Sequence, residues 1–380
     1  MLLNAGWLKF LAMLRVAEAA VGIVILVVAF YDVFQSVVLP RPSIGKLRIA
    51  PWILRPLWAS WRWWGTRETR IDRRENRLGT FGPVGLLALL AFWALSSILG
   101  YALIIDSIPD QIEPPPQDFW TSLYFSASTL LPLSYGEILP IGFVARLVIV
   151  AESATGVALI ALVISLLFSL YGSFQRREEL VVTLDALAGA PPAGLQILET
   201  VANHRMPDEL RATFDDWRRW SAAVLESHLA YPILVYFRSS HDNEAWLNSF
   251  GAVMDAATLV LSTVVSQDQT EGHARLMFKV GNHLVEDLAW YFRFKSAGVP
   301  IVERQEFDDA RQRLITAGYN CREADAAWSD FSSLRSMYAS VLNQLAGRLA
   351  ILPAKWIGDR SYVPHVERGP ARRRAPKRVS

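Results

Sequence analysis

Three long apolar runs alternate with polar stretches in the first half of the chain. The runs extend from Val16 to Leu39, from Pro83 to Ile105, and from Val144 to about Tyr171. A helix needs about 20 apolar residues to cross the hydrocarbon layer of a bilayer, and each run is long enough. The pattern therefore predicts three transmembrane helices.

The first run raises the question of a cleaved signal peptide, because Ala17-Glu18-Ala19 resembles a small-residue cleavage site. In a signal peptide the apolar region precedes the cleavage site, whereas here it follows it. We therefore interpret residues 1–40 as a retained N-terminal transmembrane helix.

A shorter apolar stretch, from Asp118 to Leu131, lies between the second and third runs. About fourteen residues are too few to cross the membrane as a helix, so the stretch predicts a re-entrant helix with Asp118 as its N-cap. The chain must then return outward through residues 129–140, "TLLPLSYGEILP". Irregular backbone at membrane depth is tolerated where it is buried in protein or lines a watery path. The loop is therefore a candidate pore lining.

From Arg176 onward the pattern is that of a soluble helical domain, which we place at residues 176–360. Helical segments are expected to begin at 191–192 and at 207, the second ending near 228, and to cover about 242–265, 270–295, 305–317 and 322–352. Strand-like alternation is confined to "YPILVYF", residues 231–237. The predicted fold class is an all-α membrane protein with an all-α bundle after its last membrane helix.

Basic residues set the expected orientation. Ten Lys and Arg residues lie between the first two runs, whereas the segment between the second and third runs has none before Arg146 and carries several acids. The positive-inside rule places the basic loop and the C-terminal domain in the cytoplasm, in the cell (inner) membrane, although Lys9 and Arg15 mildly oppose this. Five Trp residues in the basic segment, residues 41–79, favour an amphipathic stretch on the inner membrane surface over a specific lipid-binding or voltage-sensing role.

Composition narrows the function classes. Of 380 residues, 52% are hydrophobic, so one part of the chain suits a membrane and another does not, and a net charge of +2 does not favour nucleic acid as a partner. A single cysteine excludes an intrachain disulfide. His283, Glu286 and Asp287 share a helical face, which fits either a metal site or, as we prefer, a salt-bridged surface. The basic tail, residues 361–380, is expected to be disordered and either solvated or in contact with anionic lipid.

Residues 80–175 resemble the pore-loop potassium channel family, specifically its two-transmembrane pore domain. The resemblance rests on the order helix, re-entrant helix, filter loop, helix, and on Phe119-Trp120 at the start of the pore helix. It also rests on Thr129 and on Tyr135-Gly136-Glu137 followed by Pro140. The run Glu152-Ser153-Ala154-Thr155-Gly156 continues the likeness.

The resemblance implies a homotetramer in the membrane that passes monovalent cations, with potassium or sodium as the permeant ion and no other cofactor. The selectivity filter would consist of Pro132, Leu133, Ser134, Tyr135 and Gly136. Glu137 would form a carboxylate ring at the outer mouth, and Gly156 falls at the inner-helix hinge.

The filter departs from the family pattern in its inner half. The family reads Thr-Thr-Val-Gly-Tyr-Gly-Asp where this chain reads Leu-Pro-Leu-Ser-Tyr-Gly-Glu. Pro132 has no hydroxyl and no N–H, and Ser134 replaces a glycine, which costs on the order of 1–2 kcal/mol per subunit if φ is positive there. Two outcomes stay open: a shorter or wider filter with weakened selectivity, or most potassium sites with one altered rung.

Two features of the third run carry alternatives. Glu152 either supports the back of the filter, through Arg146 or a pore-helix backbone group, or coordinates ions directly. Ile164 and Phe168 lie on a face that either lines the inner vestibule, with Phe168 as a hydrophobic gate, or packs against the second run.

The function expected from these patterns is a tetrameric cation channel and not an enzyme, because the chain has no nucleophile elbow, phosphate-cradling loop or H-E-x-x-H motif. The C-terminal domain also has no G-x-G-x-x-G after a strand, so a Rossmann-type regulatory domain is not expected. The alternative is a membrane-anchored signalling or scaffold protein whose degenerate pore does not conduct.

Overall fold

The computed structural model describes residues 2–39, 49–133, 135–239, 245–265, 269–295 and 298–352. The chain forms two compact units. The first comprises Met1–Trp63, Thr80–Gly172 and His228–Val235, and the second comprises Trp64–Gly79, Ser173–Ser227 and Tyr236–Ser380. The segment expected as one interfacial stretch, residues 41–79, is divided between them. The basic tail predicted at 361–380 lies outside the described residues.

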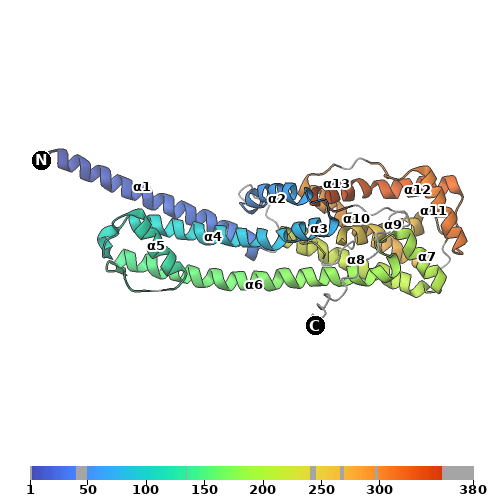
Figure 1. Cartoon of the computed structure of the whole chain (residues 1–380), viewed down its shortest axis with the longest axis horizontal. Helices are drawn as coiled ribbons and strands as arrows, with labels where there is room; N and C mark the ends of the chain where they lie inside the picture. Colours follow the sequence, from blue (N-terminus) through green and yellow to red (C-terminus); the bar gives the residue numbers. More distant parts are fainter. Residues whose placement is uncertain are drawn as a thin grey trace, which may run out of the picture. The chain divides into compact units, whose positions relative to one another are not determined.

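Three helices dominate the membrane part of the chain: α1 (Leu2–Val33), α4 (Phe81–Asp106) and α6 (Phe143–Ala188) (Figure 1). The stretches that are long and apolar enough to cross a membrane are Lys9–Val37, Arg73–Asp106 and Phe143–Ala188. The three predicted membrane helices are therefore confirmed as elements of the fold.

Two of these helices are longer than their apolar runs. Helix α1 begins near the N-terminus, well before Val16, and passes into a π-helical turn, Phe34–Val38. Helix α6 continues past Tyr171 to Ala188, where Gly189 with a φ of +73° ends it. Because no glycine or proline lies between residues 173 and 188, nothing interrupts the helical hydrogen bonds when the apolar run stops.

Helices α1 and α4 approach each other at a pair of glycines. A Cβ atom on Gly22 would lie 2.5 Å from the carbonyl oxygen of Gly100, and one on Gly100 would lie 2.7 Å from the side chain of Leu26. Small residues at a helix crossing let two backbones come this close inside a membrane, where van der Waals packing is a main source of helix association.

Asp32 is a fully buried carboxyl near the end of α1. It accepts hydrogen bonds from the indole N–H of Trp93 on α4 (2.9 Å) and from the backbone N–H of Ile49 (2.8 Å). Ile49 immediately precedes helix α2 (Ala50–Thr66), whose first amides have no partner within the helix. One side chain therefore joins α1, α4 and the start of α2.

Helix α2 has the amphipathic character that its Trp and Arg residues predict. Its buried face carries Leu54 and Trp58, and the Trp58 ring meets Phe81 edge to face at a centroid distance of 4.8 Å. Trp52 on the other face is 79% exposed. The amphipathic character is confirmed for this helix, and its position on the inner membrane surface stays a prediction.

The loop between α4 and α6 contains the pore-helix candidate α5 (Phe119–Leu130) and two short strands that flank it in sequence. After a 3-10 turn, Pro109–Gln111, strand β1 (Ile112–Glu113) pairs antiparallel with β2 (Leu139–Pro140). The side chain of Gln111 accepts from the amides of Val144 and Ala145, at 3.1 and 3.2 Å, and so caps the start of α6. The entry and exit of the loop are therefore held together.

Among the described residues of the second unit, the secondary-structure elements are helices, apart from an isolated bridge between Val264 and Cys321. Besides α3 (Ile71–Gly79), its helices are α7 (Gly194–His204), α8 (Pro207–Ala230), α9 (Trp246–Ser262), α10 (Thr270–Phe292), α11 (Arg304–Thr316), α12 (Ala324–Ser336) and α13 (Ala339–Leu349). All residues of α9 except Asn248 and Gly251 are buried, which makes α9 the central helix of this unit. The strand-like pattern at 231–237 forms a 3-10 turn, Pro232–Tyr236, instead of a strand.

One predicted helix, residues 322–352, is two helices in the structure, α12 and α13. The break falls at Tyr338, whose hydroxyl donates to the carboxylate of Asp255 (2.6 Å) and lies 3.0 Å from the hydroxyl of Thr258, both on α9. Arg335 at the end of α12 also donates to Asp255 (3.0 Å). These buried polar contacts fix α12 and α13 separately on α9, and burial beside Asp255 raises the pKa of Tyr338 well above its ordinary value.

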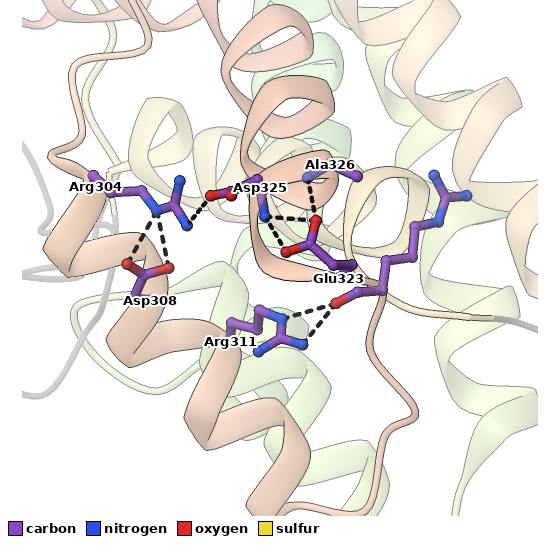
Figure 2. Close-up of polar contacts among 7 residues, drawn as sticks. Arg304, Asp308, Arg311, Glu323, Asp325 and Ala326 are labelled. Carbon is purple, nitrogen blue, oxygen red and sulfur yellow. Dashed lines mark hydrogen bonds and ion pairs between the residues drawn. The ribbon is translucent and has the colours of Figure 1, made fainter.

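Polar contacts also fix the turn between α11 and α12, as Figure 2 shows. Arg304 donates to both carboxylate oxygens of Asp308 (3.0 Å) and forms an ion pair with Asp325 (2.8 Å). Glu323 accepts from the amides of Asp325 and Ala326 and caps α12, which lowers the pKa of its carboxyl. The turn is held by side chains on both helices.

Candidate functional site

The pore-helix candidate α5 begins at the predicted N-cap. Asp118 accepts from the backbone N–H of Thr121 (2.9 Å) and from its hydroxyl (2.7 Å), and these two bonds lower the pKa of the Asp118 carboxyl. The N-cap prediction is confirmed. The opposite end of α5, near Leu130, presents the partial negative charge of its free carbonyl groups.

The chain turns sharply at the end of α5. The amide of Leu133 donates to the carbonyl of Ser128 (2.8 Å), as in the turns that close helix C-termini. The inner half of the predicted filter is therefore folded against the helix end. Ser134, a predicted filter residue, lies outside the described residues.

The outer half of the loop is open in the single chain. Gly136 has a φ of +78°, a backbone conformation that favours glycine and so accounts for this residue. Leu131, Leu133 and Tyr135 are each half exposed or more, with Tyr135 at 62%, and Glu137 is exposed as well. The side chains of a predicted filter and outer mouth thus remain uncovered.

Helix α6 lies directly against the end of α5 at Gly156. A Cβ atom there would lie 1.9 Å from the carbonyl oxygen of Leu130, so only glycine fits this contact. Helix α6 is continuous through the position. The structure therefore gives Gly156 a packing role, and the predicted hinge stays a prediction.

Glu152, one turn before Gly156, is fully buried and faces the pore helix. Its Oε1 atom lies 2.5 Å from the hydroxyl of Ser126 on α5. Arg146, one of the partners expected from the sequence, instead donates to the carbonyl of Pro140 (3.2 Å). The other expected partner was a pore-helix backbone group, and this expectation is corrected too, because the contact is with a side chain. The sequence did not single out Ser126.

Serine residues on α5 connect it to α4. The hydroxyl of Ser126 also lies 2.8 Å from the carbonyl of Ile98, and Ser122 donates to the carboxyl of Asp106 (2.7 Å). The i, i+4 spacing of these serines in an apolar stretch could have revealed this face. Thr129, by contrast, is buried, and its hydroxyl donates within its own helix, to the carbonyl of Phe125 (2.8 Å).

The gate candidates lie on an exposed face of α6. Ile160 and Ile164 are each 50% exposed and Phe168 is 78% exposed, at successive i, i+4 positions. An apolar stripe of this kind suits the wall of an inner vestibule or a contact with another subunit. The role of Ile164 and Phe168 as a gate remains a prediction.

In the second unit, α6 is held by Arg177. Its guanidinium donates to the carbonyl of Phe237 (2.7 Å), pairs with Glu178 (2.9 Å), and lies 5.2 Å from the ring centroid of Trp246. The backbone carbonyl of Arg177 accepts from the indole of Trp220 (2.9 Å). The sequence did not single out Arg177. Its burial makes it a structural link between α6 and the bundle.

The metal-site candidate lies at the exposed surface of α10. His283 and Asp287 lie 3.7 Å apart at i, i+4, and Glu286 accepts from Asn282 at 2.7 Å. Among the residues that the structure describes, no three His, Cys, Asp or Glu side chains are grouped as a metal would require. These contacts support the salt-bridged alternative.

No curated protein and no solved structure shows significant similarity to the chain. A family model described as "Ion channel" matches residues 88–172, from within α4 through the α5 loop to the exposed face of α6. The matched segment contains the pore-helix candidate, the turn at Pro132 and the Glu152 and Gly156 contacts. This match supports the predicted resemblance of residues 88–172 to the two-transmembrane pore-loop ion channel family.

Proposed function

We propose that the protein is a homotetrameric channel that passes monovalent cations through a filter formed by residues 132–136. The observation that carries the proposal is the junction of α5, its loop and α6. Leu130 meets Gly156 backbone to backbone, and the loop that follows leaves Tyr135 and Glu137 uncovered. A loop that is anchored at its base and open at its tip suits the lining of a shared path.

The proposal requires several chains because one chain supplies one loop. Pores of this type close around a symmetry axis, and four copies would surround the path. The exposed stripe of Ile160, Ile164 and Phe168 on α6 would then face the axis below the filter. In that position Phe168 is the candidate for a gate that closes by dewetting.

The proposed orientation keeps the loop outside and the helical bundle in the cytoplasm, in a cell membrane. It rests on the excess of basic residues between the first two membrane helices. In the sequence, Lys9 and Arg15 mildly oppose this orientation. In the structure Arg15 forms an ion pair with Asp110 (2.9 Å) in the acidic loop, so its charge is matched at that end of the helix.

Cation preference and ion selectivity are separable in this pore. The carbonyl end of α5 and a ring of Glu137 side chains would favour cations over anions, and neither depends on the altered filter residues. Discrimination between potassium and sodium needs a row of carbonyl groups, and the bond from the Leu133 amide back to Ser128 does not fit an extended backbone at the inner end of that row. We therefore propose weakened potassium selectivity.

Flux in liposomes tests the proposal directly. Purified full-length protein is expected to let potassium and sodium cross the bilayer, and Gly136→Ala is expected to reduce the flux because alanine is strained at a φ of +78°. Gly347→Ala serves as a matched control, since a Cβ atom there meets nothing within 4 Å. Equal flux from the Gly136→Ala and wild-type proteins would argue against this filter.

A second candidate function, a non-conducting membrane-anchored scaffold, is favoured by one observation. The bond from Leu133 to Ser128 folds the inner half of the loop onto the pore helix and so removes an extended backbone from the path. This candidate predicts an intact oligomer without cation flux. It also predicts that the double variant Pro132→Thr, Ser134→Gly shows no cation flux either.

A further inference from the structure

The hydroxyl of Ser126 has two oxygen neighbours but only one proton. Its Oγ atom lies 2.8 Å from the carbonyl oxygen of Ile98 on α4 and 2.5 Å from Oε1 of Glu152 on α6. Ile98 can only accept, since a carbonyl has no proton to give. If both contacts are hydrogen bonds, Ser126 donates to Ile98 and the proton between Ser126 and Glu152 belongs to Glu152.

The surroundings of Glu152 agree with a neutral side chain. Glu152 is 0% exposed, and its second oxygen, Oε2, has no hydrogen-bond partner among the described residues. Arg146, six residues earlier on α6, donates to the carbonyl of Pro140 instead. A buried carboxylate with a bare oxygen and no ion-pair partner among the described residues is costly, whereas the carbonyl oxygen of a carboxylic acid loses much less in the same place.

We propose that Glu152 is a carboxylic acid in the folded protein and donates its proton to Ser126. The chain of donors then runs from Glu152 on α6 through Ser126 on α5 to Ile98 on α4. It ties together the three helices that surround the filter loop. Glu152 acts as a positioning residue, because it holds the pore helix and does not meet the ion path itself.

The hydrogen bonds of Glu152 lie beside the closest helix contact of the site, that between Gly156 and Leu130. Glu152 and Gly156 are one turn apart on the same face of α6, and Gly156 meets the carbonyl of Leu130 at the end of α5. Glu152 therefore fixes the middle of the pore helix at Ser126, and Gly156 fixes its end at Leu130. The placement of the proton is independent of conduction, whereas its effect on flux rests on the proposed function.

Difference infrared spectroscopy of the full-length protein in liposomes at neutral pH tests the proposal. The spectrum of wild type minus Glu152→Gln is expected to contain the C=O stretch of a carboxylic acid. The same subtraction with Glu137→Gln, an exposed outer-mouth carboxyl, is expected to contain the paired bands of a carboxylate. Carboxylate bands in the Glu152 subtraction would overturn the proposal.

A second variant keeps the test decisive if Glu152→Gln does not fold. Ser126→Ala removes the acceptor of the Glu152 proton, so the acid C=O band is expected to shift in frequency while the bands of other carboxyls stay in place. An unshifted band would contradict the bond from Glu152 to Ser126. If the acid band is present but no cation flux is measured, the proposed function is refuted and the protonated Glu152 stands. If cation flux is measured but Glu152 gives carboxylate bands, the protonated Glu152 is refuted and the proposed function stands.

Discussion

At the residue scale, single glycines and buried carboxyls decide how closely the membrane helices approach one another. Gly22, Gly100 and Gly156 each stand where a Cβ atom would meet another helix, and Asp32 and Glu152 supply polar contacts inside an apolar environment. These positions are where a small chemical change should have a large effect.

Gly156→Ala is expected to separate α6 from the end of the pore helix, because the new methyl group would lie 1.9 Å from the Leu130 carbonyl oxygen. Overpacking of this kind typically costs about 1–3 kcal/mol. The unfolding temperature in detergent and the cation flux in liposomes should both fall. Gly272→Ala, which meets nothing within 4 Å on α10, is the control and should leave both unchanged. If Gly156→Ala leaves both the unfolding temperature and the flux unchanged, the contact between Gly156 and Leu130 is not essential.

Asp32→Ala is expected to destabilise the junction of α1, α2 and α4, since it leaves the Trp93 indole and the Ile49 amide without their acceptor. A buried donor left unpaired costs about 1–3 kcal/mol. A double-mutant cycle with Trp93→Phe, followed by thermal unfolding, measures the coupling. Strictly additive effects of the two substitutions would mean that the hydrogen bond contributes nothing.

Local rules predicted some of these residues and missed others. Asp118 was recognisable as a cap because its partner, Thr121, is three residues away. The partners of Asp32 and Glu152 lie on other helices, and an apolar run does not show which faces of two helices meet. Glu152 was therefore recognised as a buried acid, but its bond to Ser126 needed the packed structure.

At the element scale, α6 carries the proposed pore lining in its first part and a buried arginine in its last part. The helix continues without a break from Phe143 to Ala188. Arg177 is surrounded by Phe237, Trp246 and Glu178 of the second unit. The anchored residue Arg177 and the gate candidates Ile164 and Phe168 therefore lie on one unbroken helix.

Arg177→Met tests this anchor. The substitution leaves buried Glu178 without its cation, and breaking a buried ion pair in this way typically costs about 3–5 kcal/mol. The neighbouring Arg176→Met, at an exposed position, is the matched control. The unfolding temperature should drop for Arg177→Met and stay unchanged for Arg176→Met. Equal behaviour of the two variants would remove the case for an anchor at Arg177.

The extents of elements were harder to predict than their existence. Each membrane helix was predicted from its apolar run. Helices α1 and α6 extend beyond their runs because the flanking residues, although outside the apolar run, still favour helix. The break between α12 and α13 depends on the buried bond between Tyr338 and Asp255, two residues far apart in sequence. No local pattern contains that information.

At the scale of the whole molecule, the proposal concerns an assembly. A single chain leaves Tyr135, Ile164 and Phe168 exposed, and four copies around one axis would bring these residues together. Mass measurement of the detergent-solubilised protein, corrected for bound detergent, is expected to give four times the chain mass of 42.6 kDa. A monomer or dimer at all detergent-to-protein ratios would be incompatible with a pore of this type.

The central claim is that monovalent cations pass through residues 132–136, and bi-ionic reversal potentials test it most directly. With potassium on one side of a planar bilayer and sodium on the other, the wild-type channel is expected to carry current with only a small preference for potassium. The Pro132→Thr, Ser134→Gly double variant is expected to shift the reversal potential toward potassium. The absence of cation current from both proteins would contradict the account.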